Sequence, residues 1–175
     1  MPQLDVIPSQ YLNGQLNQID KEVLPYLLQM IEDGRKAGVK LRVRSPYRSY
    51  AIQKMLFTDQ VQSELINGYS REKAESEAAT VVARPGTSEH QTGLAVDLNA
   101  TSQIFENSAE YAWMKEHASD YGFILRYPLD KTEITGIIYE PWHYRFVGIK
   151  VAKEMEQLGM CFEEYYEYKK LGEQN

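Results

Sequence analysis

Two short stretches hold two of the three histidines of this 175-residue chain, each beside acidic residues. The first is residues 88–97 (SEHQTGLAVD), in which a glycine separates His90 from Asp97. The second is residues 140–145 (EPWHYR), in which Glu140 and His143 are three positions apart. We interpret the two stretches as the halves of one zinc site.

The separation of His90 and Asp97 limits how they can share an ion. In a fully extended chain they would lie about 23 Å apart, and in a helix roughly 10 Å apart. Both distances are too long, so the chain must turn between them, and Gly93 allows the backbone to do so. We therefore expect His90 on a loop and Asp97 on the strand that follows.

The second stretch reads as a strand in which His143 points away from Trp142 and Tyr144. One face is then aromatic core, with Trp142 packed beneath His143 and available as a pocket wall. Pro141 interrupts the strand and can redirect the chain before it. Glu140 can then stand beside a metal without binding it.

Two imidazoles and one carboxylate, with a fourth position left for water, suit a catalytic zinc ion. Zinc lowers the pKa of its water, and a nearby carboxylate takes the proton. Glu140 is the candidate for this general base. From the residues alone, a metal site and ordinary core or surface histidines both remain open. We expect the third histidine, His117, at the surface of a helix.

Arg48 lies in the turn-forming segment 45–49 (SPYRS), which ends a predicted strand. A guanidinium binds a terminal carboxylate, or polarises a carbonyl, better than a lysine does. Arg48 is therefore a candidate for contact with a peptide substrate. A structural ion pair is the alternative.

The composition excludes several other classes of protein. The single cysteine, Cys161, rules out an internal disulfide and a thiolate zinc cluster. The net charge of −6 offers no basic surface for nucleic acid. No window approaches the ~20 apolar residues of a membrane span, and no signal peptide is visible. A chain that had lost such a segment would look the same.

The hydrophobic pattern predicts strands and helices that alternate without strict βαβ spacing. Residues 1–15 are expected to form an extended arm, and Asp20 to cap a helix that ends at Gly34 or Gly38. Further strands are expected over 39–44, 94–99, 121–125 and 142–147, helices over 50–66 (capped by Ser49), 70–82, 106–119, 148–158 and 162–171, and a polar loop over 126–135. We expect an α+β fold, with a small, mostly antiparallel sheet flanked by helices in a single domain.

The two chemical stretches resemble the paired metal motifs of the zinc D-Ala-D-Ala carboxypeptidases of the VanY type. They contain Ser88-x-His90-x-x-Gly93-x-Ala95-x-Asp97 and Glu140-x-Trp142-His143-x-Arg145. Residues 45–49 look like the family's Ser-x-Tyr-Arg-Ser turn, although Pro46 stands where a glycine is common. The resemblance implies the Hedgehog/D-Ala-D-Ala peptidase-like fold, with residues 1–19 as an arm and 20–175 as the zinc carboxypeptidase domain.

The resemblance also assigns roles to single residues. It implies one Zn²⁺ per chain on His90, Asp97 and His143, with Glu140 as catalytic base. Arg48 would be catalytic and would meet the substrate. The remaining substrate-binding residues would be Gln53, Ser88 and Trp142.

The implied reaction is removal of the terminal D-Ala from peptidoglycan stem peptides or precursors, which would also strip the ligand of vancomycin-type antibiotics. The alternatives are an L,D-carboxypeptidase on tetrapeptide stems, a D,D-dipeptidase, an L-Ala-D-Glu endopeptidase, and a non-catalytic zinc module that binds wall fragments. The sequence lacks the motifs of a serine peptidase, so we do not expect a serine mechanism. We expect a monomer that does not bind nucleic acid. It would act at the cell envelope if the chain is part of a longer protein, and in the cytoplasm if it is complete.

Overall fold

The computed structural model describes residues 1–172, and its centre is a four-stranded antiparallel sheet with the order β3-β4-β6-β5. A second, two-stranded sheet pairs β1 with β2. The strands cover Leu4–Val6 (β1), Gln18–Asp20 (β2), Val43–Ser45 (β3), Ala95–Leu98 (β4), Phe123–Leu125 (β5) and His143–Phe146 (β6). This confirms the α+β class with a small antiparallel sheet.

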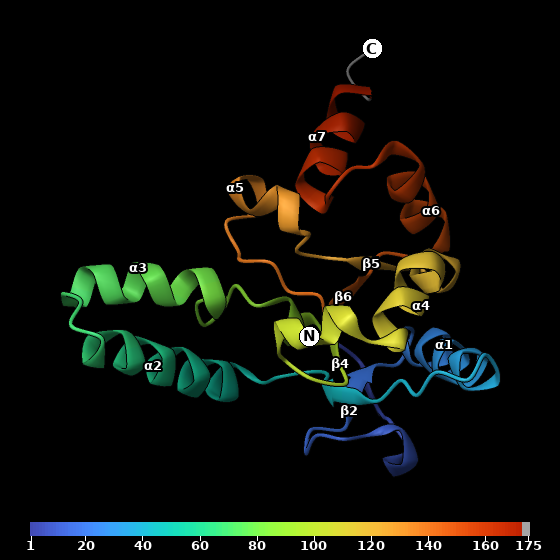
Figure 1. Ribbon diagram of the computed structural model, residues 1–175, viewed down its shortest axis with the longest axis horizontal. Coiled ribbons are helices and arrows are strands. Elements are labelled where there is room, and N and C mark those ends of the chain that lie inside the picture. Colours follow the sequence, from blue (N-terminus) through green and yellow to red (C-terminus); the bar gives the residue numbers. More distant parts are fainter. Residues whose placement is uncertain (173–175) are drawn as a thin grey trace.

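Helices lie around the sheet, with α1 and α4 beside it and α6 and α7 at the edge formed by β5 (Figure 1). The α-helices cover Leu24–Lys36 (α1), Tyr50–Ile66 (α2), Arg71–Val81 (α3), Ala109–His117 (α4), Thr132–Thr135 (α5), Ile149–Leu158 (α6) and Phe162–Gly172 (α7). Short 3-10 helices cover Ser9–Tyr11 (η1), Glu89–Thr92 (η2), Gln103–Asn107 (η3), Ala118–Tyr121 (η4) and Leu129–Lys131 (η5). Among residues 1–172, none of these helices combines the length and apolar character needed to cross a bilayer.

The main core lies on one face of the sheet, under α1 and α4. Strand residues alternate between faces, so Val96 and Tyr144 enter this core while Asp97 and His143 face the other way. Trp142 also belongs to the core, as expected for a residue that packs beneath His143. The other fully buried members include Leu27, Met30, Ile31, Leu98, Met114 and Phe123.

The first twenty residues form part of the main core and are not only an extended arm. Ile7 and Ile19 are fully buried in the main core, because β1 and β2 pair beside it. Strand β2 crosses the boundary between residues 19 and 20, and the division into arm and domain stays a prediction. Asp20 is a strand residue, so its assignment as helix cap was wrong: Val23 precedes α1.

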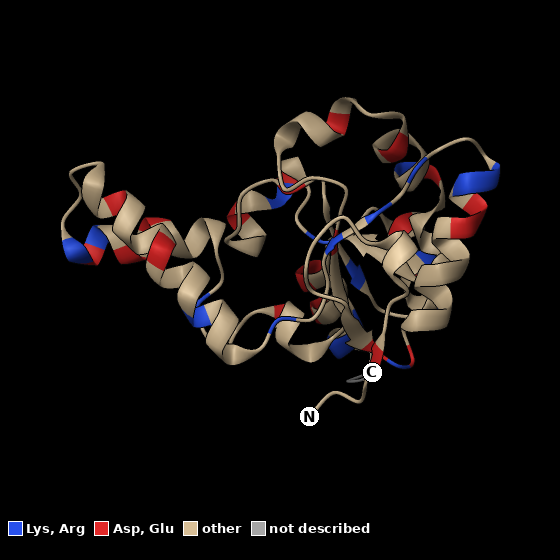
Figure 2. Cartoon of the chain, turned by 90° about the horizontal axis from the view of Figure 1, so that it is seen from below, with Lys and Arg blue, Asp and Glu red and all other residues tan. Residues whose placement is uncertain are grey.

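Helices α2 and α3 form an antiparallel pair that extends away from the sheet (Figure 1). Ser49 and Ser70 accept hydrogen bonds from Ile52 N and Lys73 N at the starts of the two helices, as expected for caps. The pair has a small core of its own, made of Val61, Ala74 and Ala78 with Phe57 and Leu65. Figure 2 shows acidic residues along this pair with basic ones among them.

Three expected elements differ from the structure. Strand β3 starts only at Val43, because side chains of Asn99 and Glu110 accept the backbone N–H groups of Arg42 and Lys40 in place of a neighbouring strand. The helix predicted over 106–119 is α4 with η3 before it and η4 after it. The segment 126–135 is not a polar loop throughout: it contains η5 and α5, and Arg126 is buried.

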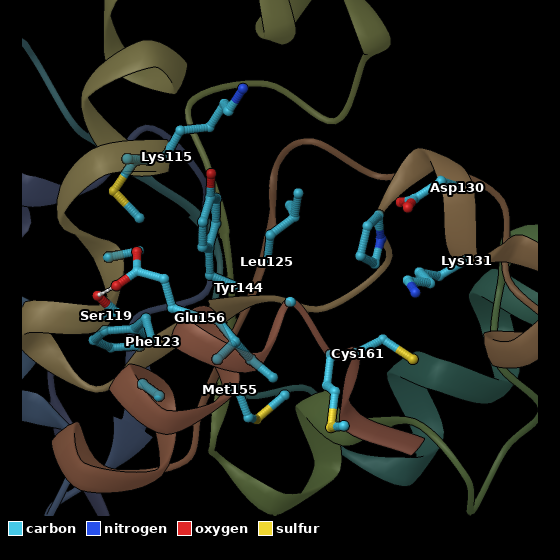
Figure 3. Close-up of a pocket in the computed structure, with 17 residues that line it drawn as sticks. Lys115, Ser119, Phe123, Leu125, Asp130, Lys131, Tyr144, Met155, Glu156 and Cys161 are labelled. Carbon is cyan, nitrogen blue, oxygen red and sulfur yellow. Dashed lines mark hydrogen bonds between the residues drawn. The ribbon is translucent and has the colours of Figure 1, made fainter. Parts of the chain in front are cut away.

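Helices α6 and α7 cover the outer strand β5, where Ile124 packs with Ala152, Met155 and Tyr165. A cavity of about 400 Å³ opens at this edge (Figure 3). Its lining comes from both faces of β5, since Phe123 and Ile124 point in opposite directions. Cys161 is buried and belongs to the same lining.

Candidate metal centre

The pairing of β4 with β6 brings Asp97 and His143 together. The two residues are direct partners in the antiparallel register, and such cross-strand neighbours lie on the same face of a sheet. Asp97 Oδ1 is 3.2 Å from His143 Nδ1. Their contact follows from strand pairing, so it joins residues 46 positions apart without any special loop.

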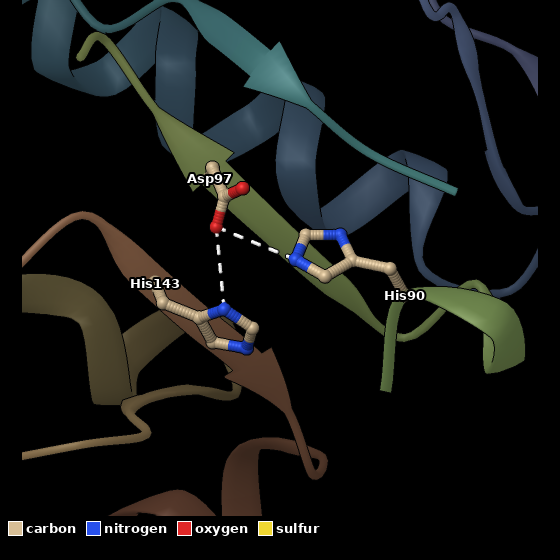
Figure 4. Close-up of side chains that lie close together, drawn as sticks. All are labelled: His90, Asp97 and His143. Atoms are coloured by element: carbon tan, nitrogen blue, oxygen red, sulfur yellow. Dashed lines mark ion pairs between the residues drawn. The ribbon is translucent and has the colours of Figure 1, made fainter. Parts of the chain in front are cut away.

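His90 reaches the same point from η2, the short helix that precedes β4 (Figure 4). Gly93 ends η2 in the left-handed region, with φ of +74°, which is the turn predicted from the spacing. A Cβ at this position would also lie 2.9 Å from Asp20 N, so a side chain is excluded for a second reason. His90 Nε2 lies 3.4 Å from Asp97 Oδ1.

The three side chains make a buried site that fits a zinc ion. One possible ligand atom from each of His90, Asp97 and His143 lies within 4.8 Å of the others. His90 Nε2 and Asp97 Oδ1 are buried and have no hydrogen-bond partner among the described residues, a costly arrangement for polar atoms unless something binds them. Two nitrogens and one oxygen match the donor set of catalytic zinc.

Charge is arranged around Asp97 so that the carboxylate stays ionised. Burial alone would raise its pKa, but His90 and His143 hold the pKa of Asp97 far below its usual value. Burial lowers the pKa of His90. For His143, burial acts in the same direction, but Asp97 and Glu89 outweigh it and raise the pKa to about 9. In the absence of a metal, the protonated His143 therefore balances Asp97.

Glu140 lies beside this group without joining it. It precedes β6, and its Oε2 is 3.5 Å from His143 Nδ1. Burial raises the pKa of Glu140 to about 7, and the nearby His143 only partly opposes this effect. A carboxylate with a pKa near neutrality can both accept and return a proton.

Arg48 is held against the outer oxygen of Asp97. Its Nη2 lies 3.2 Å from Asp97 Oδ2, and its Nη1 donates to Gln53 Oε1 at 3.1 Å. Gln53 is fully buried and donates in turn to the carbonyl of Ala83 at 2.7 Å. In this structure Gln53 therefore fixes the guanidinium.

The site lies in a cleft with three neighbouring cavities, each of which shares lining residues with the next. The largest, of about 730 Å³, is lined by Arg48, Asp97, Glu140 and Trp142 together with residues 14–16 and one side of α2. A narrow part of about 50 Å³ contains Ser88, His90 and His143. Beyond it lies a cavity of about 310 Å³. The structure thus brings together all eight residues chosen from the sequence, while His117 lies apart from them and is partly exposed.

Three residues of the site were missed by sequence reasoning: Glu89, Arg126 and Tyr127. Glu89 Oε2 faces His143 Nε2 at 3.6 Å, and Arg126 Nε contacts Glu89 Oε1 at 2.7 Å. The ring of Tyr127 lies 4.9 Å from that of His143, measured between centroids. Only Glu89 carried a signal, as the acid directly before His90; Arg126 lies in a segment that reads as polar loop.

Comparison with known proteins places this site in a family. Residues 16–149 match the family model VanY, D-alanyl-D-alanine carboxypeptidase. A D-alanyl-D-alanine carboxypeptidase of Enterococcus faecalis is 45% identical over 163 residues, which are 93% of this chain and 60% of that protein. The chain therefore spans less than two thirds of the length of this relative.

Two solved structures share the fold, and the match covers a larger part of their chains than of the Enterococcus faecalis protein. One is a mutant of the vancomycin resistance D,D-pentapeptidase VanY in complex with Zn(II), with a TM-score of 0.78 and 44% identity over 93% of this chain and 94% of that one. The other is the LD-carboxypeptidase LdcB, with a TM-score of 0.82 and 38% identity over 94% of this chain and 77% of that one.

Proposed function

Since this chain belongs to the VanY family of D-alanyl-D-alanine carboxypeptidases, we propose that it is a zinc-dependent D,D-carboxypeptidase that removes the terminal D-Ala from D-Ala-D-Ala-ending stem peptides. The observation that carries the proposal is the buried His90–Asp97–His143 group, in which His90 Nε2 and Asp97 Oδ1 have no hydrogen-bond partner among residues 1–172, beside Glu140 and Arg48 in one cleft. The VanY relative solved with Zn(II) supports the choice of metal.

The residues divide into a metal-holding set and a reacting set. His90, Asp97 and His143 would hold one zinc ion, which when bound supplies Lewis-acid polarisation and a lowered pKa for water. Glu140 is placed to take a proton from the attacking water at its free carboxylate oxygen and to return it to the leaving amine of D-Ala. Its burial keeps that carboxylate near the required pKa.

Arg48 supplies the positive charge that the scissile peptide needs. Gln53 and Asp97 fix the guanidinium in place, so it is preorganised for the developing oxyanion or for a substrate carboxylate. Ser88 and Trp142 line the cleft beside it and complete the proposed contacts. Gln53 would act on the substrate through Arg48.

The size of the cleft favours a carboxypeptidase over a dipeptidase. The cavity of about 730 Å³ on the Arg48 side is large by the standard of ligand sites, which run from about 300 to 1,000 Å³. A dipeptide needs only a small, closed pocket, whereas a stem peptide continues on the amino side of the cut bond. The partner we propose is thus a peptidoglycan stem, met at the cell wall by a monomer.

An L,D-carboxypeptidase that acts on tetrapeptide stems is the second candidate. The similarity to LdcB, an LD-carboxypeptidase with a TM-score of 0.82, favours it. The metal chemistry is indifferent to the configuration of the penultimate residue, so the walls of the cleft decide between the two. A non-catalytic zinc module is disfavoured, because Glu140 and Arg48 are both in place.

Release of D-Ala from three substrates tests the proposal. The purified protein is incubated with pentapeptide stem, tetrapeptide stem and free D-Ala-D-Ala, before and after thorough chelation and zinc re-addition. We expect cleavage of the pentapeptide, insensitive to β-lactams, lost on chelation and restored by zinc. Preference for the tetrapeptide would support the L,D alternative. Full activity after metal removal would refute the zinc mechanism.

A further inference from the structure

In each of the two histidines of the site, one ring nitrogen points away from the proposed metal position. These two outward nitrogens have different partners. For His90, that nitrogen is Nδ1, which lies 2.7 Å from the carbonyl oxygen of Pro46. A carbonyl can only accept, so His90 Nδ1 carries the proton and Nε2 is free for a metal. For His143, the outward nitrogen is Nε2, and it faces a carboxylate: Glu89 Oε2 lies 3.6 Å away.

Glu89 is buried and is itself fixed by two arginines. Its Oε1 accepts from Arg126 Nε at 2.7 Å and lies 3.0 Å from Arg145 Nη1. Its other oxygen, Oε2, has no hydrogen-bond partner among residues 1–172, and neither has His143 Nε2. Two unpartnered, buried atoms of complementary chemistry thus face each other, at a distance slightly too long for a hydrogen bond.

Arg126 extends the arrangement to the C-terminal helix. Its Nη1 and Nη2 bind the two oxygens of Glu163, in the first turn of α7, at 3.0 and 2.5 Å. Its guanidinium also lies over the ring of Phe162, 5.0 Å from the centroid. An unbroken series of contacts therefore joins α7 to a metal-ligand candidate, in the order Glu163, Arg126, Glu89, His143.

We propose that Glu89 is a positioning residue: it keeps the His143 proton on Nε2, so that Nδ1 points to the metal, and the two arginines keep Glu89 in place. This inference rests on the proposed zinc site. A carboxylate behind a metal-binding histidine fixes the tautomer and ring orientation and makes the ligand nitrogen more basic. Glu89 Oε2, at 3.6 Å, is the nearest acceptor that the structure offers to a proton on His143 Nε2.

The expected loss of zinc affinity on removing Glu89 can be estimated from other carboxylates that contact a metal-binding histidine. Loss of such a partner costs about 10–100-fold in metal affinity or activity. Glu89→Gln keeps the shape of the side chain but removes its charge, and its amide can turn a donor toward His143. We expect zinc affinity to fall by about 10–100-fold in this variant. Glu163→Gln leaves Glu89 in place and frees one side of Arg126, so a smaller loss is expected.

Zinc affinity is measured by competition with a chromophoric chelator, for the wild type, Glu89→Gln, Glu163→Gln and Glu164→Gln. Glu164→Gln is the matched control, because Glu164 is on the same helix but pairs with Lys131, outside the series. The graded order Glu89→Gln, Glu163→Gln, control supports the proposal. Equal zinc affinity in Glu89→Gln and the control overturns it. A wild type that binds no zinc refutes the proposed function instead.

A spectroscopic measurement on the wild type decides the matter even if Glu89→Gln does not fold. Nitrogen-15 NMR of the zinc-loaded protein distinguishes a metal-bound ring nitrogen from a protonated one. We expect zinc on Nδ1 of His143 and on Nε2 of His90, with an Nε2 proton of His143 that is protected from exchange with water. Zinc on Nε2 of His143, or a freely exchanging Nε2 proton, overturns the role of Glu89.

Discussion

Asp97 on β4 and Glu140 just before β6 are two carboxylates of one cleft, and their pKa values move in opposite directions. Asp97 contacts Arg48 at 3.2 Å, His90 at 3.4 Å and His143 at 3.2 Å, and its pKa lies far below the usual value. Glu140 has one charged neighbour within 4 Å among residues 1–172, His143 at 3.5 Å, and its pKa is raised to about 7.

The difference arises from position in the sheet. Asp97 is inside β4, where strand pairing places His143 opposite it, and His90 from η2 and Arg48 from the segment after β3 reach the same carboxylate. Glu140 stands outside β6, where only burial acts strongly on it. One cleft thus keeps one acid charged for a metal and leaves the other able to exchange a proton.

Asp97→Asn should have the largest effect on zinc affinity and on hydrolysis. The amide keeps the shape but removes the charge that holds the metal and balances Arg48. Because loss of an outer partner alone costs about 10–100-fold in metal affinity, we expect zinc affinity to fall by more than about 100-fold and hydrolysis to disappear with it. Chelator competition and a D-Ala release assay measure both. Zinc affinity close to that of the wild type would exclude Asp97 as a ligand.

Glu140→Gln should separate the two roles. The side chain contacts the metal-holding set only through His143, so zinc binding should remain within a few fold of the wild type. Loss of a general base lowers kcat by about 10²–10⁴-fold, and we expect a decrease of this size. Full zinc occupancy with unchanged kcat would assign the proton transfer to another residue.

Sequence reasoning found the parts of the molecule that depend on local chemistry. The cap Ser49, the helix start near Ser70, the turn at Gly93 and the placement of His90 and Asp97 follow from a few neighbouring residues. The predictions of a helix cap at Asp20 and of a strand over residues 39–42 were wrong, because the backbone partners of these residues are remote in the sequence. The N–H of Asp20 donates to the carbonyl of Gly93, and the N–H groups of Lys40 and Arg42 donate to the side chains of Glu110 and Asn99.

The surroundings of the site were harder to predict for the same reason. Glu89 and Arg126 are 37 residues apart, as are Arg126 and Glu163. Arginines of a predicted loop are usually exposed, and nothing near Arg126 in the sequence marks it as buried. The opposed pKa shifts of Asp97 and Glu140 likewise depend on burial and on contacts across strands, which spacing does not reveal.

The smallest expected effect concerns the stability of the metal-free protein, where the same amide substitution should act with opposite sign at the two positions. The folded-state pKa of Glu140 is raised from 4.5 to about 7. Its protonated form therefore stabilises the fold fully below pH 4.5, and this contribution is lost as the pH rises through 7. Gln cannot ionise, so Glu140→Gln should be more stable than the wild type at pH 8 by about 3 kcal/mol, and within about 1 kcal/mol of it at pH 5.

Asp97 has a lowered pKa, so its carboxylate stabilises the fold above the unfolded pKa of 3.8 and stops doing so only in strong acid. Asp97→Asn leaves Arg48 and His143 as buried charges without their partner and should cost about 3 kcal/mol at pH 5. Urea unfolding of chelated wild type and both variants at pH 5 and pH 8 measures the free energies. If the two substitutions shift stability in the same direction at pH 8, the contrast between the carboxylates does not hold in the metal-free protein. Opposite signs would show that the charged form of Asp97 stabilises the folded protein and that the charged form of Glu140 destabilises it. Glu140 is the proposed proton carrier because the protein interior disfavours its charge.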